Sequence, residues 1–260
     1  MKTKRRLSVA YILLVLLFLY LPMACVVVYS FNTSKSTAIW GGFTLDWYIQ
    51  MARDRNLIGA LIVSLRAAAA TSVVSAVIGT LGAVALERAS GRLASAVKGF
   101  VYLPLVIPEV VIGVALMMLF SAIRLPDGTA VLVLAHSTFC IPYVFILVHI
   151  RLRMIDPAIR EAARDLGASR FAAFATITLP LAAPAILSGA LLAFAMSLDD
   201  VVISFFVSGP QSQTLPLQIF SMLRLGITPK INALCTIILV VTFLIVGIIT
   251  ALDTRAAKNK

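Results

Sequence analysis

The chain has 260 residues, of which 61% are hydrophobic and only 13% are charged, and its formal net charge is +11. A soluble domain carries about 25% charged residues, so this composition excludes an ordinary soluble protein and favours a membrane protein. The excess basic residues flank apolar segments, which favours contact with anionic lipid headgroups over nucleic-acid binding.

Six apolar segments are long enough to cross the hydrocarbon core, which takes about 20 residues. In chain order, these predicted spans are approximately residues 7–30, 56–86, 99–123, 128–150, 182–207 and 231–252. A backbone in lipid must satisfy its own hydrogen bonds, so each span should be helical. We therefore predict an all-α fold with six transmembrane helices in a single domain, residues 1–260. Pro104 and Pro108 predict a distorted helix in the third span.

The first apolar segment follows the basic residues Lys2 to Arg6 and so resembles a secretory signal peptide. Its apolar stretch is longer than the roughly 7–15 residues of a signal core. We therefore expect a retained span.

Lys and Arg are distributed unevenly between the two sets of connecting segments. The set that includes both termini and the loop 151–181 holds 15 of the 22, the other set holds 6, and Arg66 lies within a span. Cytoplasmic connections carry the excess of positive residues. We therefore expect a multi-pass protein of the bacterial cytoplasmic (inner) membrane, with both termini and the loop 151–181 in the cytoplasm.

The loop 151–181 has signals for two short helices. Asp156 can cap a helix that begins at Pro157, and Gly167 suits its left-handed end. Ser169 can cap a second helix, which Pro180 should end just before the fifth span. The first helix should present one small apolar face, formed by Ile159, Ala162, Ala163 and Leu166.

The same loop carries the motif Glu161-Ala162-Ala163, then Gly167, then Ile177-Thr178-Leu179-Pro180, with the spacing EAA-x3-G-x9-I-x-LP. This motif resembles the signature of the membrane-spanning subunits of binding-protein-dependent ABC importers, the MetI-like superfamily. Further segments across nearly the whole chain are similar to the spermidine/putrescine permeases: Leu21-Pro22, Tyr29-Ser30-Phe31-Asn32, Trp47-Tyr48, His136-Ser137-Thr138-Phe139-Cys140, Ser197-Leu198-Asp199-Asp200, Ser208-Gly209-Pro210 and Asn232-Ala233-Leu234.

The resemblance implies a permease subunit that translocates polyamines and has the MetI-like core fold. It implies four kinds of component: this permease, a second homologous permease, two ATP-binding cassette subunits that use ATP and Mg²⁺, and an extracytoplasmic polyamine-binding protein. The residues that would couple the permease to the ATPase are Glu161, Ala162, Ala163, Gly167, Ile177, Leu179 and Pro180.

Nothing in the sequence predicts catalysis, a bound cofactor or a metal in this chain. The phosphate-binding motif G-x-x-x-x-G-K-[ST] is absent, so ATP hydrolysis would require a separate subunit. The cysteines Cys25, Cys140 and Cys235 lie inside predicted spans without metal-ligand spacing. We expect a subunit that is not an enzyme.

Three acidic residues, Glu109, Asp199 and Asp200, lie within predicted spans. Ionisable groups at that depth usually face a transport pathway or a partner, and carboxylates suit the ammonium groups of a polyamine. Trp47 could add a cation–π surface at the outer mouth. We predict a substrate pathway formed by Asp199, Asp200, Glu109, Trp47 and Ser197, the last from the Ser-Leu-Asp-Asp segment.

Each of these residues also has a structural interpretation. The two aspartates could cap a helix or form internal pairs, Glu109 could bond backbone groups freed by the prolines, and Trp47 could belong to the interfacial aromatic belt. His136 and His149 favour helix packing. Arg66 could snorkel, pair with Asp199 or meet the companion permease.

Two other functions fit parts of the same pattern. One is an ABC importer for another cationic or amine solute, since the sequence does not separate putrescine from spermidine. The other is an ion-coupled secondary transporter, in which intramembrane acids would carry protons or ions. The loop 151–181 favours the ABC importer, because a secondary transporter has no ATPase to dock.

Overall fold

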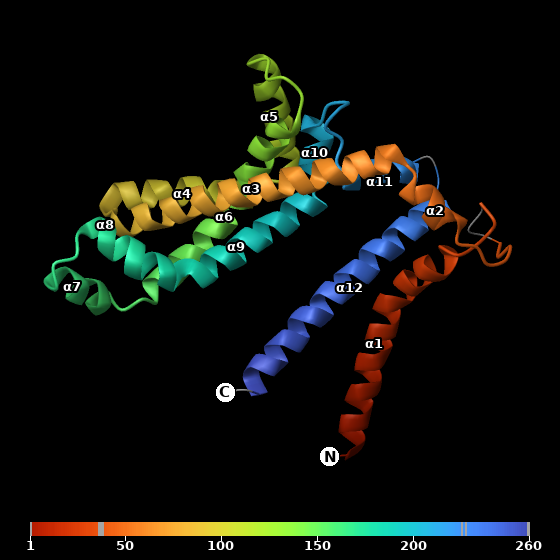
Figure 1. The fold of residues 1–260 in the computed structure, drawn as a ribbon, viewed down its shortest axis with the longest axis horizontal. Helices are drawn as coiled ribbons and strands as arrows, with labels where there is room; N and C mark the ends of the chain where they lie inside the picture. Colours follow the sequence, from red (N-terminus) through yellow and green to blue (C-terminus); the bar gives the residue numbers. More distant parts are fainter. Residues whose placement is uncertain (1, 36–38, 225, 227, 259–260) are drawn as a thin grey trace. The chain divides into compact units, whose positions relative to one another are not determined.

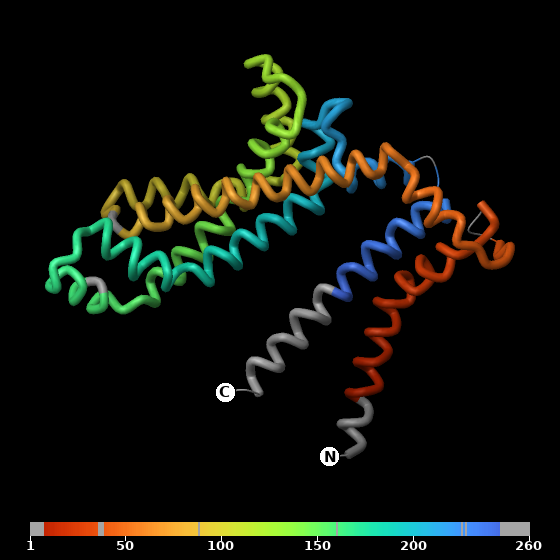
Figure 2. Tube along the Cα trace, in the orientation of Figure 1, coloured from red at the N-terminus to blue at the C-terminus, as the bar shows by residue number. Residues whose placement is uncertain are grey.

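The computed structural model describes the backbone of residues 2–35, 39–224, 226 and 228–258 (Figures 1 and 2). Side chains in this part are described except those of residues 2–7, 88, 160 and 245–258. Every named element there is helical, and the only β-type pairing among the described residues is an isolated bridge between Asn32 and Phe43. The predicted all-α fold is confirmed.

The chain forms two compact units, Met1–Ile58 with Ile219–Lys260, and Gly59–Gln218. In the first unit, α1 (Lys2–Tyr29) and α2 (Asp46–Ala52) both pack against α12 (Pro229–Lys258). The helices of the second unit are α4 (Gly91–Val106), α5 (Glu109–Ala122), α6 (Thr129–Arg153), α7 (Pro157–Asp165), α8 (Arg170–Ala173), α9 (Leu179–Asp199) and α10 (Val202–Val207). A π-helical turn (Phe174–Thr178) joins α8 to α9, while α3 (Arg55–Arg88) and α11 (Leu215–Arg224) cross the boundary between the units. The interpretation of the chain as one domain stays a prediction.

Four described helices are long and apolar enough to cross a membrane: Ser8–Tyr29, Arg55–Glu87, Thr129–Arg153 and Arg170–Asp199. Neither α4 nor α5 is long enough alone, and the two reach the length and hydropathy of a span only together. The described apolar segment of α12, Pro229–Leu244, is too short as well. The count of six spans therefore stays a prediction.

The distortion predicted in the third span, residues 99–123, is a break that divides the segment between two helices. The chain bends by 105° between α4 and α5. Ile107 has an extended backbone (φ −76°, ψ 131°) because the ring of Pro108 disfavours helical geometry in the residue before it. The fifth predicted span, residues 182–207, is interrupted as well, because α9 ends at Asp199 and α10 begins at Val202.

The core of the second unit surrounds α6, whose Leu132, Val144 and Phe145 are buried. Two glycines let neighbouring helices approach it. A Cβ atom on Gly79 of α3 would lie 2.8 Å from Val144 Cβ, and one on Gly189 of α9 would lie 3.1 Å from Val144 Cγ1. Small residues at such crossings are typical of helices packed in lipid.

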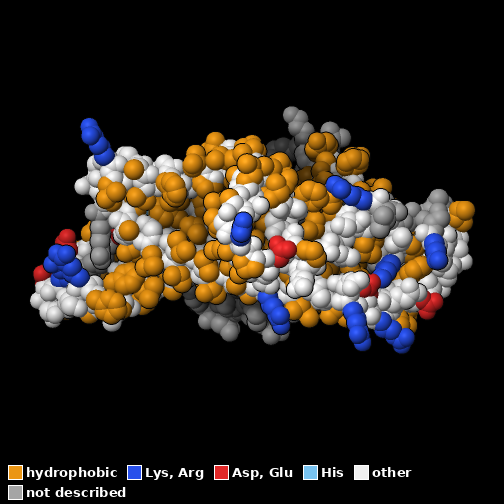
Figure 3. Space-filling view, turned by 90° about the horizontal axis from the view of Figure 1, so that it is seen from above, with side chains coloured by type: hydrophobic (Ala, Val, Ile, Leu, Met, Phe, Trp, Pro, Cys, Tyr) orange, Lys and Arg blue, Asp and Glu red, His pale blue; other side chains and the backbone are white. Residues whose placement is uncertain are grey.

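Large apolar side chains also cover much of the exposed surface, as the broad hydrophobic area in Figure 3 shows. They include Phe18 and Leu17 of α1 and Phe100 and Leu103 of α4. A soluble monomer rarely exposes apolar patches of this kind. The surface therefore suits surrounding lipid or partner subunits.

Candidate functional site

The break between α9 and α10 is organised by Asp200. Its backbone is extended (φ −67°, ψ 127°), which ends α9. The Asp200 carboxylate accepts hydrogen bonds from the backbone N–H of Ser204 (2.7 Å, Oδ2) and of Ile203 (3.3 Å, Oδ1). The first N–H groups of a helix have no partner within that helix, so Asp200 caps α10.

His136 of α6 lies next to this cap, and its ring is fully buried. Its Nδ1 atom is 2.7 Å from Ser197 Oγ, and its Nε2 atom is 3.1 Å from Ser204 Oγ and 3.3 Å from Asp200 Oδ2. Neutral imidazole satisfies this arrangement when Ser197 donates to Nδ1 and the Nε2–H group donates to Asp200. We call His136, Ser197, Asp200 and Ser204 the His136 cluster.

Asp199, the neighbour of Asp200, is exposed. Arg66 of α3 is exposed too, and among the described residues neither has an ion-pair partner within the chain. The two adjacent aspartates therefore differ: Asp200 is held inside the protein, whereas the Asp199 carboxylate is open to a ligand or a partner.

Glu109 lies in the first turn of α5, immediately after the 105° bend, and its side chain is exposed. Pro108, at the cap position of α5, makes no side-chain capping bond. The bend thus leaves a second carboxylate of the second unit accessible.

Trp47 belongs to the first unit and has a structural contact that the sequence did not predict. Its indole N–H donates to the backbone oxygen of Asn32 (2.7 Å), and Asn32 is fully buried. Next to it, the hydroxyls of Tyr48 and Ser30 are 2.6 Å apart. Two segments that resemble the permeases, Tyr29–Asn32 and Trp47-Tyr48, are therefore joined in one loop. Trp47 as a whole is half-buried.

The first helix of the loop 151–181 begins and ends as predicted. Asp156 accepts a hydrogen bond from the Ala158 N–H (2.9 Å), and Pro157 is the first residue of α7. Gly167 has φ +90°. Around it the N–H groups of Gly167 and Ala168 donate to the carbonyls of Arg164 and Ala163, the Schellman pattern.

The predicted apolar face of α7 is uncovered. Leu166 is 89% exposed, Ile159 is 46% exposed, and Phe171 of α8 is 78% exposed. A short, capped helix with exposed apolar side chains can fit into a groove on another protein, which is the chemistry of a docking element.

The prediction that Pro180 ends the second helix of the loop is wrong. The helix that begins at Arg170, capped by Ser169 as expected, continues through the π-helical turn into α9. Pro180 lies in the first turn after that π-helical turn, where the change of hydrogen-bonding pattern accommodates its missing N–H. Ile177 is half-buried, whereas Leu179 and Pro180 are exposed.

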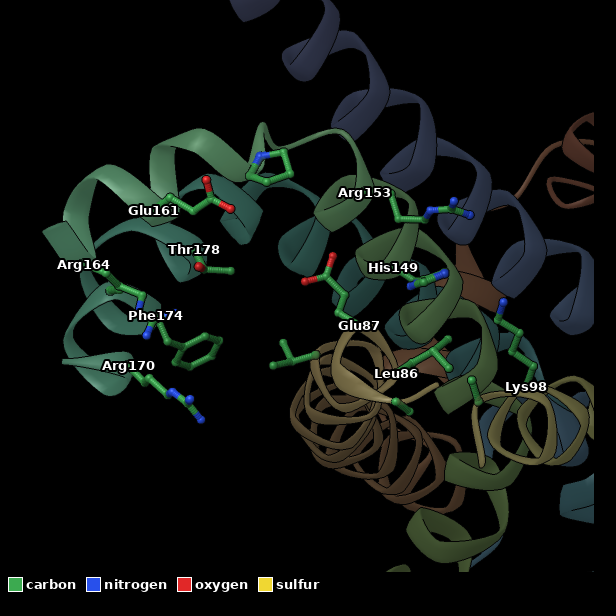
Figure 4. Close-up of a pocket in the computed structure, with 15 residues that line it drawn as sticks. Leu86, Glu87, Lys98, His149, Arg153, Glu161, Arg164, Arg170, Phe174 and Thr178 are labelled. Carbon is green, nitrogen blue, oxygen red and sulfur yellow. The ribbon is translucent and has the colours of Figure 1, made fainter. Parts of the chain in front are cut away.

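A pocket of about 730 Å³ lies between α7, α8 and the π-helical turn on one side and the adjacent ends of α3, α4 and α6 on the other (Figure 4). Glu161, Arg164, Arg170 and Phe174 line one side, and Glu87, Lys98, His149 and Arg153 line the other. Its charged lining is mainly basic, which agrees with the excess of positive residues expected on the cytoplasmic side.

The residues predicted to couple to an ATPase and the Asp199–Asp200 break are thus two separate candidate sites, at opposite ends of α9. Sequence reasoning missed Ser204 and treated His136 as a packing residue. Two features of the sequence could have indicated this cluster. One is a histidine within a predicted span, and the other is a pair of serines, three residues before and four residues after Asp200. That these side chains meet depends on tertiary packing.

The family described as "Binding-protein-dependent transport system inner membrane component" matches residues 75–258. The putrescine transport system permease protein PotI of Escherichia coli (strain K12) is 44% identical over 252 residues, covering 94% of this chain and 89% of PotI. The spermidine/putrescine transport system permease protein PotC of Haemophilus influenzae is 41% identical over 246 residues, covering 95% of each. A chain of a bacterial ABC transporter that imports alginate has a similar fold, with a TM-score of 0.75 at 18% identity, covering 97% of this chain and 95% of that one.

Proposed function

We propose that this chain, which belongs to the family of binding-protein-dependent transport system inner membrane components, is a polyamine-translocating permease subunit of an ATP-driven importer. The observation that carries the proposal is the similarity to putrescine and spermidine/putrescine permeases along nearly the whole chain. The break at Asp199 and Asp200 lies within the Ser-Leu-Asp-Asp segment, which resembles the spermidine/putrescine permeases, and leaves one carboxylate exposed.

The energy for transport would come from two separate ATP-binding cassette subunits. The exposed apolar side chains of α7 and α8 would dock in a groove of one ATPase, and movement of that groove would displace the loop. Because a π-helical turn joins the loop directly to α9, a displacement of α8 would reach the α9–α10 break without an intervening hinge. This chain would bind no cofactor and catalyse no reaction.

The cation would be recognised by carboxylates exposed at helix breaks. Asp199 and Glu109 each lie at the end of a helix, and each is exposed. A polyamine carries ammonium groups separated by methylene chains, and each ammonium forms charge-assisted hydrogen bonds with a carboxylate. A second homologous permease would complete the pathway, and an extracytoplasmic polyamine-binding protein would deliver the substrate.

Whole-cell uptake tests this proposal. Deletion of the gene should abolish high-affinity accumulation of radiolabelled putrescine or spermidine, and expression of the wild-type chain should restore it. Competition by unlabelled putrescine, spermidine and a basic amino acid would separate polyamine transport from transport of another amine. Unchanged polyamine uptake in the deletion strain, or competition by the amino acid alone, would contradict the proposal.

A further inference from the structure

We infer that the two adjacent aspartates have different tasks: Asp199 meets the transported cation, and Asp200, held by His136, is a positioning residue that sets the direction of Asp199. This inference rests on the proposed function, because it assigns roles within the same cation pathway. It adds His136 and Ser204 to that pathway as residues that act through Asp200, and it gives Ser197, already predicted there, a positioning role through its contact with His136.

Most of the hydrogen-bonding capacity of Asp200 is already used inside the protein. The residue is 9% exposed, and its Oδ1 atom accepts from Ile203 N–H. Its Oδ2 atom accepts from Ser204 N–H at 2.7 Å and lies 3.3 Å from His136 Nε2. A carboxylate has about four acceptor positions, and three are occupied here. An ammonium group would find one free acceptor position on this nearly buried carboxylate, and any further bond would have to displace the cap of α10.

Asp199, in contrast, is exposed and makes no ion pair among the described residues. It is the last residue of α9, so its direction depends on where the helix ends. Ser197, two residues before it, and Asp200, directly after it, are both fixed by contacts with the His136 ring. Asp199 is therefore held from both sides by one imidazole.

The His136 ring also joins three helices. His136 belongs to α6, Ser197 to α9 and Ser204 to α10, and the three residues are at most 2% exposed. The ring thus bridges both sides of the break and ties it to the core helix of the second unit. Hydrogen bonds in such a dry setting are strengthened, and a missing partner is costly. Loss of the imidazole should make the backbone between α9 and α10 more mobile. The Asp199 carboxylate would then no longer be held in one direction.

The test is uptake by the assembled importer in proteoliposomes, with KM and maximal rate measured per assembled complex. Asp199→Asn should raise the KM for polyamine by about tenfold or more, the effect of losing one charge-assisted bond, while assembly stays normal. Asp200→Asn should change the KM by less than about threefold, because an amide oxygen can keep the 2.7 Å bond to Ser204 N–H.

His136→Gln separates positioning from general destabilisation. It should raise the KM about tenfold in the wild-type background and add no further increase in the Asp199→Asn background, because the residue that it positions is then absent. Ser204→Ala removes one contact of the ring and should give a smaller increase of the same kind. Ser72→Ala is the matched control: it removes a 2.6 Å hydrogen bond from α3 to the Ala190 carbonyl of α9, away from the break.

The outcomes are distinct. A wild-type complex that imports no polyamine contradicts the proposed function, and with it the cation-binding task of Asp199. A wild-type complex that imports polyamine, with His136→Gln and Ser204→Ala complexes at wild-type KM, overturns the positioning role alone. A large KM effect of Asp200→Asn without one of Asp199→Asn would reverse the assignment of the two aspartates.

Discussion

Gly113 of α5 lies directly against the ring of Phe206 on α10, so that a Cβ atom at position 113 would be 2.6 Å from Phe206 Cδ2. This contact joins the helix after the 105° bend to the helix after the Asp200 break. Gly113→Ala should destabilise the protein by about 1–3 kcal/mol, because the aromatic ring must move to make room. Thermal unfolding in detergent and polyamine uptake would both measure the loss.

A compensating change tests the contact itself. Phe206→Leu removes the ring atom that a Cβ at position 113 would meet. It should therefore restore part of the stability and uptake lost in Gly113→Ala. Gly59→Ala is the control, since Gly59 is exposed on α3 with no atom within 4 Å of its added Cβ. Equal loss in Gly59→Ala and Gly113→Ala, or no rescue by the leucine, would refute the proposed contact.

Gly167 ends α7 with φ +90° and has open space around it, so a substitution there meets backbone strain and no steric clash. Gly167→Val should destabilise the C-terminal end of α7 by about 1–2 kcal/mol and shift the exposed apolar face of this helix. We expect weaker ATPase association, or ATP hydrolysis uncoupled from uptake, with normal membrane abundance. Gly99→Val, in equally open space inside α4, serves as the control. Normal coupling in Gly167→Val would remove this residue from the coupling role.

Leu166 is almost fully exposed, which is costly unless a partner covers it. Burial of a leucine side chain contributes about 1.5–3 kcal/mol. Leu166→Ser should therefore weaken co-purification of the ATPase by roughly tenfold to hundredfold. Leu45→Ser offers a control, because Leu45 is an exposed leucine in a segment that we predict on the opposite side of the membrane. If both variants retained the ATPase equally well, the docking face would lie elsewhere.

Lys230 at the start of α12 donates a hydrogen bond to Asp54, just before α3, within the first unit. This hydrogen bond lowers the pKa of the Asp54 carboxyl from its ordinary value, against the opposing effect of burial. A lowered folded-state pKa stabilises the protein above the unfolded value, near 3.8, and the contribution is lost as the pH falls through the folded pKa. Asp54→Asn should cost about 1 kcal/mol at neutral pH.

The pH dependence is the sharper measurement for this pair. The difference in thermal stability between wild type and Asp54→Asn should be constant from pH 7 to about pH 5 and should shrink below about pH 4. Lys230→Met should lose the same stability at neutral pH, and the double variant should lose little more. Fully additive losses would show that the two side chains do not act as a pair.

The sequence predicted the elements whose signals are local. Asp156-Pro157 and Gly167 located α7 correctly, because a helix cap and a left-handed glycine act within a few residues. The distortion in the third span was predicted at Pro104 and Pro108, and the extended Ile107 directly before Pro108 agrees with this local signal, but the sequence does not specify the 105° angle between α4 and α5. The prediction at Pro180 was wrong because the helix continues through a π-helical turn directly before α9. Such a turn has no simple sequence signal.

The candidate pathway was predicted only in part, for a related reason. Charge and depth single out Asp199, Asp200 and Glu109 as a group, but they do not say which carboxylate is already bonded. That distinction depends on His136, which is 64 positions from Asp200 in the sequence and reaches it only when α6 packs against α9 and α10. The Trp47 indole was missed for the same reason, because its hydrogen bond to the Asn32 carbonyl forms only when the segment between α1 and α2 folds.

The most direct test of the central claim is transport by the purified parts. This chain, its companion permease, two ATPase subunits and the binding protein would be reconstituted in liposomes with ATP on the cytoplasmic face. We expect radiolabelled putrescine or spermidine to accumulate only when ATP and every component are present. This chain alone, under an imposed proton gradient, should accumulate none. Accumulation by the chain alone, driven by the proton gradient, would refute the ATP-driven importer and identify a secondary transporter.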